Sequence, residues 1–184
     1  MIVNKEDEWE FASKAGLFQS AIAVDGNPWA WKDSGMTNKH KQWNHGVIVW
    51  DGKQLHHYLN GKKGKSHDMP EKAVKSTKST FKVGRRERGG ATHSVFDGLV
   101  DEVRISDNIR YDADYDVPKF AFVADDHTLY LLHLDNEDIE GHKSKTMAKW
   151  GRTPCWKVLL NWSMLNFRIQ SEAQCKQLLT QGID

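Results

Sequence analysis

Apolar and polar residues alternate along much of this chain, which is the pattern of strands that bury one face. The clearest case is the sequence LVDEVRIS at residues 99–106, in which Leu99 and Ile105 share one face of an extended segment. Asp97-Gly98 directly before it is a turn signal, because glycine reaches positive φ without strain. The pattern therefore predicts a strand here, and its Val and Ile residues suit a pleated backbone.

The same pattern predicts further strands, at residues 8–12, 17–24, 43–50, 54–59, 80–84 and 128–134. In the strand at 54–59, Leu55 and His57 are expected on one face and Tyr58 on the other. Segments with little periodicity are expected to be loops, at residues 29–41, 62–79 and 85–92.

Three segments resemble motifs of one family. Residues 96–106 (FDGLVDEVRIS) resemble the closing motif of laminin-G-like domains, which are relatives of concanavalin-type lectins and glucanases. Residues 43–62 resemble that family's Trp-x-His hairpin, and residues 126–135 resemble its final strand. The order and spacing agree over about residues 8–136. The resemblance implies an all-β fold, a two-sheet antiparallel jelly-roll sandwich of the concanavalin A type.

The family's opening strands are not found ahead of residue 8, so the domain is expected to be incomplete at its N-terminus. After about Gly141 the resemblance ends, and we divide the chain into a jelly-roll domain at 1–142 and a C-terminal tail at 143–184. Residues 156–167 of the tail are apolar enough to need a partner surface, either as a strand that replaces a missing one or as a helix on the sandwich. A capping-box pattern predicts a terminal helix over 172–181.

Composition fits a soluble protein, with 28% charged and 39% hydrophobic residues, and a length of 184 residues fits one domain or one domain plus a tail. No apolar run approaches the roughly 20 residues that cross a membrane, and no signal-peptide pattern opens the chain. The two cysteines, Cys155 and Cys175, both lie in the tail and do not indicate a redox compartment. The resemblance implies part of a larger extracellular or surface protein, of the adhesin or phage-tail type.

The net charge of +1 conceals a basic segment. Residues 62–88 contain ten basic residues, which makes them a candidate site for a polyanion such as a sulfated glycan. The candidate ligands are Lys62, Lys63, Lys65, Arg85, Arg86 and Arg88. The simpler alternative is a solvated lysine-rich loop. Nucleic acid fits poorly, because no aromatic platform lies between these residues.

A second candidate site would bind sugar. Trp29, Trp31, Asn38 and His40 combine ring faces, which stack on sugars, with groups that hydrogen-bond hydroxyls. For the two tryptophans the alternative is loop anchoring. Trp43 and Trp50 are expected in the core, Trp43 because it lies in the family's Trp-x-His motif.

Calcium is a weaker candidate. Asp112, Asp114 and Asp116 are spaced like the start of a calcium loop, but Val117 and Val123 stand where an EF-hand needs glycine and glutamate. No cofactor is required by the sequence, and calcium at loop tips is an open alternative that some relatives offer.

Catalysis is not expected. Glucanase-type relatives carry acids at alternating strand positions, whereas the adjacent Glu137 and Asp138 would face opposite ways. The leading hypothesis is a non-catalytic recognition module that binds a glycan or a glycosylated protein surface. The alternatives are an assembly module without a small ligand, which a filled concave sheet face would favour, and a degenerate glucanase-like hydrolase. The oligomeric state is left open.

Overall fold

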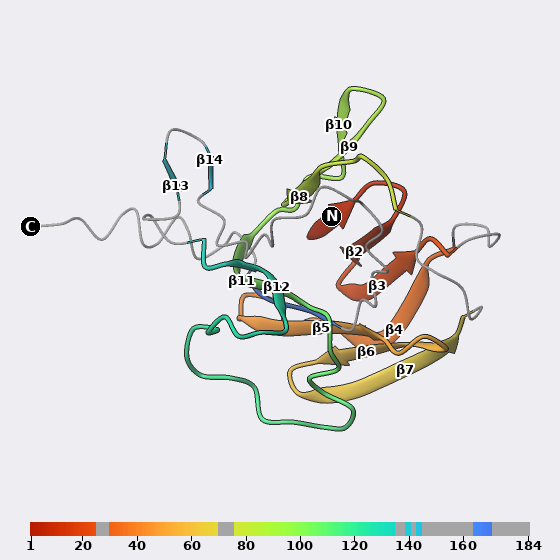
Figure 1. Ribbon diagram of the computed structural model, residues 1–184, viewed down its shortest axis with the longest axis vertical. Helices are drawn as coiled ribbons and strands as arrows, with labels where there is room; N and C mark the ends of the chain where they lie inside the picture. The colour runs from red at the N-terminus through yellow and green to blue at the C-terminus, as the bar shows by residue number, and fades with distance from the viewer. Residues whose placement is uncertain (25–29, 70–75, 135–138, 141–142, 145–163, 171–184) are drawn as a thin grey trace, which may run out of the picture.

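The structure, a computed structural model, describes residues 1–24, 30–69, 76–134, 139–140, 143–144 and 164–170. All regular secondary structure in these residues is β-strand, and it forms two main antiparallel sheets packed face to face (Figure 1). The predicted all-β sandwich is therefore confirmed. The helix predicted at 172–181 lies outside the described residues.

The first sheet has five strands in the order β4-β3-β2-β1-β8. Their bounds are Lys32–Thr37 (β4), Leu17–Ile22 (β3), Trp9–Lys14 (β2), Val3–Lys5 (β1) and Phe81–Val83 (β8). A short hairpin of Arg86–Arg88 (β9) and Ala91–His93 (β10) follows β8 and projects beyond this sheet (Figure 1).

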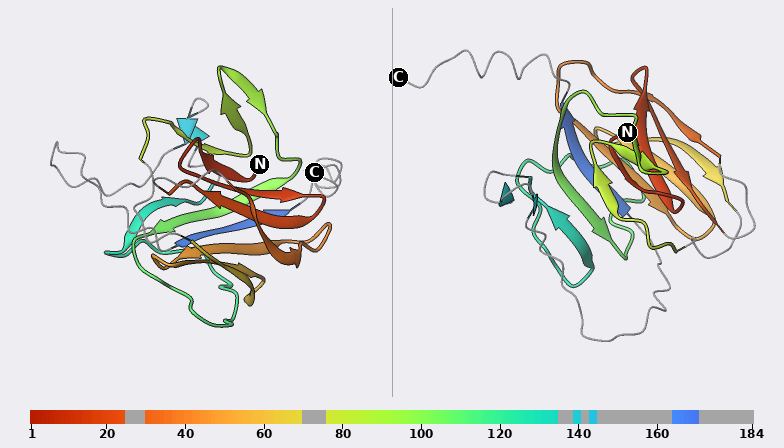
Figure 2. Two further views of the ribbon diagram at one scale, coloured as in Figure 1. Left: turned by 90° about the vertical axis from the view of Figure 1, so that its right-hand side faces the viewer. Right: turned by 90° about the horizontal axis from the view of Figure 1, so that it is seen from above.

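The second sheet has six strands in the order β12-β11-β15-β5-β6-β7. Their bounds are Thr128–Leu132 (β12), Leu99–Ser106 (β11), Met164–Gln170 (β15), Asn44–Trp50 (β5), Gln54–Leu59 (β6) and Lys62–Asp68 (β7). A separate hairpin is formed by Ile139–Glu140 (β13) and Lys143–Ser144 (β14). The views in Figure 2 show the two sheets as layers that face each other.

The core lies between the layers. The first sheet contributes residues such as Phe11 and Phe18, whose stacked rings have centroids 5.3 Å apart, and the second contributes Ile48, Leu55 and Val103. All five are buried, as alternation along their strands predicts. Trp50 is 7% exposed and belongs to this core, so the prediction for that residue is confirmed.

One polar bridge crosses the core. His57 of β6 lies 2.7 Å from the Ser20 hydroxyl of β3, measured from Nε2 to Oγ, and 3.2 Å from the Lys65 carbonyl, measured from Nδ1. Because a carbonyl only accepts, Nδ1 donates to Lys65 and Nε2 accepts from Ser20. Burial lowers the pKa of His57 to about 4, so the ring is neutral at pH 7 and joins the two sheets as a neutral group.

Several strands were not predicted. The sequences of β4 (KDSGMT) and β7 (KKGKSHD) are polar, and both segments were expected to be loops. They are the outermost strands on one side of each sheet, where solvent meets most side chains and no alternation is needed. The short β1 and the β9–β10 hairpin were missed as well, the latter because its sequence is glycine-containing and charged.

The tail contributes a strand to the middle of the second sheet. β15 lies between β11 and β5 and runs antiparallel to both. The apolar stretch 156–167 was predicted to be either a strand or a helix, and its residues 164–167 belong to a strand. Its residues 156–163 lie outside the described part. The division of the chain at residue 142 stays a prediction.

Candidate functional site

The outer face of the second sheet, which points away from the core, is covered by the chain itself. Val47, Val49 and Tyr58 of β5 and β6 are buried there under the β11–β12 connection, residues 107–127 (Figure 1). Tyr111 and Tyr115 of this connection stack with centroids 3.6 Å apart. Apolar side chains therefore fill the face over these two strands.

His45 of β5 anchors the cover. Its Nδ1 lies 2.8 Å from the hydroxyl of Tyr115, and its ring meets those of Tyr111 and Phe122 edge-on, with centroids 6.3 and 6.0 Å away. Burial raises the pKa of the Tyr115 hydroxyl, so it stays protonated and remains able to donate. The motif residue His45 thus has a structural role.

The connection is also tied to β11. Glu102 is buried, accepts a hydrogen bond of 2.7 Å from the backbone N–H of Phe122, and pairs with Nδ1 of His133 at 2.8 Å. The guanidinium of Arg104 lies 4.2 Å from the centroid of the Phe122 ring, a cation–π contact. These contacts hold the second half of the connection against the sheet.

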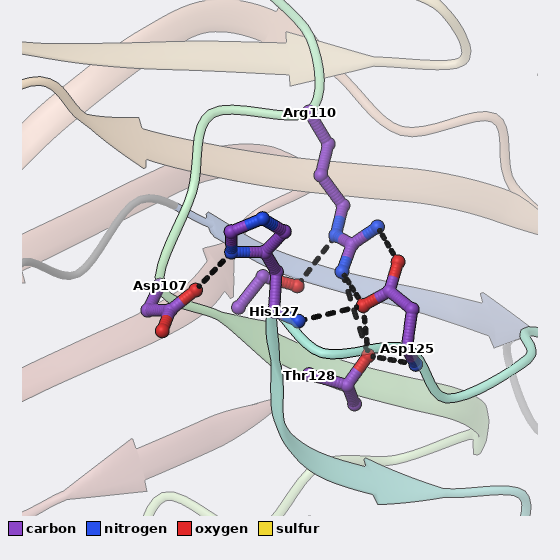
Figure 3. A network of polar contacts seen from close by, with 6 residues as sticks. Asp107, Arg110, Asp125, His127 and Thr128 are labelled. Carbon is purple, nitrogen blue, oxygen red and sulfur yellow. Dashed lines mark hydrogen bonds and ion pairs between the residues drawn. The ribbon is translucent and has the colours of Figure 1, made fainter.

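A polar network closes the base of the connection (Figure 3). Arg110 donates two hydrogen bonds to Asp125, of 2.8 and 2.6 Å, and Asp125 also accepts from Thr128. His127 pairs with Asp107 at 2.9 Å. The paired guanidinium holds the pKa of Asp125 well below its ordinary value. The network joins the first residues of the connection to its last ones, so its role is to fix this loop.

Where the covered face ends, a pocket of about 410 Å³ opens. Its wall consists of Trp43, Asn44, His45, Asn60 and Asp101 from the sheet side, and Val117, Pro118 and Lys119 from the connection. Trp43, the tryptophan of this wall, is 45% exposed to solvent. The prediction that Trp43 belongs to the core is therefore wrong. It directly precedes β5, where the chain leaves the sandwich and a ring can face solvent.

Hydrogen bonds brace the part of the pocket wall that contains Asn44 and Asn60. The side-chain oxygen of Asn44 accepts hydrogen bonds from the Lys39 N–H (2.8 Å) and the Asn60 amide (3.1 Å), and its amide donates to the carbonyls of Lys39 and Gln42. Asn60 in turn accepts from the His45 N–H at 2.8 Å. These bonds fix the loop that carries Trp43 to the β6–β7 turn.

A laminin-G-type family model, described as the concanavalin A-like lectin/glucanases superfamily, matches residues 1–114. The chain belongs to this superfamily. At the family level it is a carbohydrate- or protein-binding domain, and laminin-G-like domains are generally non-catalytic and typically extracellular or surface-associated. No curated protein and no solved structure was found to match the chain. Within the described residues, no helix is long and apolar enough to cross a membrane.

The residues predicted to bind sugar do not form one site in this laminin-G-like domain. Trp31 is 37% exposed and precedes β4, whereas Asn38 and His40 follow it, and six strand residues span roughly 20 Å. His40 lies in the loop that leads to Trp43 and is exposed. Trp29 lies outside the described residues.

The predicted polyanion ligands are divided between two ends of the molecule. Lys62, Lys63 and Lys65 belong to β7, and the three arginines lie at the β9–β10 hairpin on the far side (Figure 1). Most have acidic partners: Lys62 pairs with Asp114, Lys65 with Asp33, Arg85 with Glu87, and Arg86 and Arg88 with Glu6. Lys63 donates to the Asp112 carbonyl. The six residues therefore do not make one basic patch.

The aspartates considered for calcium serve the connection. Asp114 accepts hydrogen bonds from the backbone N–H of Lys63 (2.8 Å) and the Lys62 ammonium (3.0 Å), and these donors lower its pKa. Asp112, Asp114 and Asp116 are all exposed. In the part of the chain that the structure describes, they do not come together with other acidic or histidine side chains as a metal-binding group.

Three buried acidic residues near the N-terminus form a row that the sequence did not predict. Glu6, Glu8 and Glu10 alternate at the start of the chain, and each is less than 9% exposed. Arg86 lies 2.7 Å from Glu6 and 3.1 Å from Glu10, and Lys5 lies 2.6 Å from Glu8. Burial raises the pKa of Glu10 to about 7. The alternate spacing of the three glutamates was the signal in the sequence that could have identified the row. Their burial and their basic partners indicate a structural role.

Proposed function

We propose that the pocket beside Trp43 binds a sugar unit of a glycan, and that the domain acts as a recognition module. The observation that supports this most directly is that Trp43, a residue 45% exposed, lies in the wall of a pocket that also contains several polar side chains. The indole ring offers a flat apolar surface, and the apolar face of a sugar stacks on such a ring.

The polar wall suits hydroxyl groups. The amide of Asn60 has a second N–H beyond the one that it donates to Asn44, and the Lys119 ammonium extends from an exposed residue of the wall. Asp101 adds a carboxylate acceptor to the same wall. The arrangement of one ring with a few convergent polar groups is common in small-ligand sites.

Hydrolysis is a weaker alternative. Glycosidases need two carboxyl groups that flank the scissile bond, about 5 to 9 Å apart. Among the described residues that line this pocket, Asp101 is the single carboxylate. The acid row of Glu6, Glu8 and Glu10 lies buried among basic partners. We therefore favour binding without catalysis.

A glycan array provides the test, with the wild type and two variants as probes. Trp43→Ala is expected to weaken binding by about 5- to 150-fold, if a sugar on this ring gains the roughly 1–3 kcal/mol that stacking of a base on an aromatic ring contributes. Trp31→Ala is the matched control, because it removes an exposed tryptophan from the other end of β4 and should bind like the wild type. Equal loss in both variants, or full binding by Trp43→Ala, would exclude this pocket.

Two further conditions separate the other predicted sites. Binding that disappears with a chelator would indicate calcium and return attention to Asp112, Asp114 and Asp116. Binding that disappears with added salt alone would indicate the basic residues of β7 or of the β9–β10 hairpin.

Assembly without a small ligand is the second candidate function. It is favoured by the filled outer face of the second sheet and by the tail strand β15 within that sheet. The absence of binding to any glycan by a correctly folded wild type would make assembly the leading proposal.

A further inference from the structure

β15 joins two strands that are not paired with each other. Six of its residues pair with β11 and five with β5, and it lies between them (blue in Figure 2). Without β15 the sheet would consist of a two-stranded β11–β12 part and a three-stranded β5–β6–β7 part. The space between β11 and β5, which we call the slot, has the width of one strand, and its two edges are about 10 Å apart.

Both strands that border the slot pack against the core. Ile48 of β5 and Val103 and Ile105 of β11 are buried in the same cluster as Phe11 and Phe18 of the opposite sheet. Packing against that sheet fixes both edges of the slot in position. A strand that enters it meets preformed rows of backbone donors and acceptors, which lowers the entropic cost of binding.

The strand that fills the slot is connected to the domain by a long segment. β12 ends at Leu132 and β15 starts at Met164, with 31 residues between them, 133–163. A contact that closes a long loop forms later in folding than a hairpin contact. Until this contact forms, the edges of β11 and β5 are unpaired, and unpaired edges pair readily with other chains.

We propose that residues 164–170 are a donor strand that can fill the slot of a second copy of this chain, so that two copies exchange strands. The pairing made by an exchanged strand is identical to that made within one chain, and only the course of the linking segment differs. Exchange is consequently favoured by high protein concentration during folding, whereas the closed monomer is favoured by dilution. The proposal does not depend on sugar binding.

The register supplies a direct test. Leu99 of β11 pairs with Gln170 of β15, and directly paired residues have Cα atoms about 4.5–5.5 Å apart, within the range of a disulfide. One variant carries Leu99→Cys and the other Gln170→Cys, each with Cys155 and Cys175 replaced by serine. The two are mixed in denaturant, refolded together at low and high concentration, oxidised and run on a non-reducing gel.

Strand exchange predicts a disulfide-linked species at twice the chain mass of 21.1 kDa, and its share should increase with the refolding concentration. The matched control replaces Gln170→Cys by Leu165→Cys, which pairs with Ile105 and lies roughly 20 Å along the strand from Leu99. This control should give no linked species, so equal amounts in both mixtures would mean random collision and overturn the proposal.

A double variant, Leu99→Cys with Gln170→Cys in one chain, completes the design. If it closes an internal disulfide while the mixture never links two chains, β15 stays in its own chain and exchange is wrong. If neither experiment gives a disulfide, residues 164–170 do not occupy the slot and the proposal fails at its first step.

Discussion

His57 makes the stability of this protein dependent on pH in a predictable direction. Its pKa falls from an ordinary 6.5 to about 4 in the folded state, because the ring is buried between the sheets, and this burial outweighs the opposing effect of the hydrogen bond to the Lys65 carbonyl. A lowered histidine pKa contributes stability that is complete above pH 6.5 and is lost as the pH falls towards 4. The full shift corresponds to about 3 kcal/mol, of which about 2 kcal/mol is lost between pH 7.5 and pH 5.

The perturbation is His57→Gln, which keeps a polar group near Ser20 but cannot become charged. At pH 7.5 we expect this variant to be less stable than the wild type by about 1–3 kcal/mol, because a buried hydrogen-bonded ring has been replaced. At pH 5 the gap should shrink by about 2 kcal/mol, since only the wild type loses the histidine contribution.

The assay is urea unfolding followed by tryptophan fluorescence, for both proteins at each pH and at one ionic strength. Other titrating groups, Glu10 among them, are present in both proteins and cancel in the difference. His40→Gln is the matched control, because it changes an exposed histidine, and it should follow the wild type at both pH values. A gap between His57→Gln and the wild type that is the same at pH 7.5 and pH 5 would refute the reasoning.

Two more predictions concern stability. Glu10→Gln should stabilise the protein at pH 8 by up to about 3 kcal/mol, and this gain should vanish near pH 4.5. The reason is that a carboxyl whose folded pKa is raised to about 7 destabilises the fold once it ionises. Urea unfolding at both pH values measures the gain, and an equal gain at both would contradict the prediction. Gly61→Ala should destabilise by about 1–3 kcal/mol, since Gly61 has φ of 79° and an added Cβ would meet the Tyr115 carbonyl oxygen. The thermal midpoint measures this, with Gly52→Ala as a control that has positive φ but open space.

The sequence predicted those strands in which apolar alternation faces a core. β6 was predicted with the correct faces, because Leu55 must be buried for the sandwich to form. In β11 the predicted face is correct for Val103 and Ile105, but it is wrong for the start of the strand, because a register shift between Asp101 and Arg104 places Val100 rather than Leu99 against the core. The polar β4 and β7 carry no such signal, since strand pairing through the backbone is independent of side-chain hydropathy. β4 and β7 form because the neighbouring strands of each sheet offer backbone partners, and not because of the hydropathy of their own residues.

The candidate site was harder to predict for a related reason. Trp43 lies in a family motif beside a buried strand, and sequence alone does not say on which side of the strand end its ring emerges. Trp31 and His40 were grouped because they are close in sequence, but β4 runs between them and separates them. The basic residues were grouped in the same way, although β7 and the β9–β10 hairpin belong to different ends of the fold.

The β11–β12 connection explains why the pocket lies where it does. Tyr111, Tyr115 and Phe122 close the outer sheet face, so a ligand has no open groove over β5 and β6. The same segment then supplies Val117 to Lys119 as one wall of the pocket, opposite Trp43. Its ends are held by Arg110 and Asp125, so the position of that wall depends on a network that a ligand need not touch. The β11–β12 connection thus covers the outer face of the second sheet and also forms part of the pocket wall. The pocket lies at the end of the sheet, where loops can vary without disturbing the core.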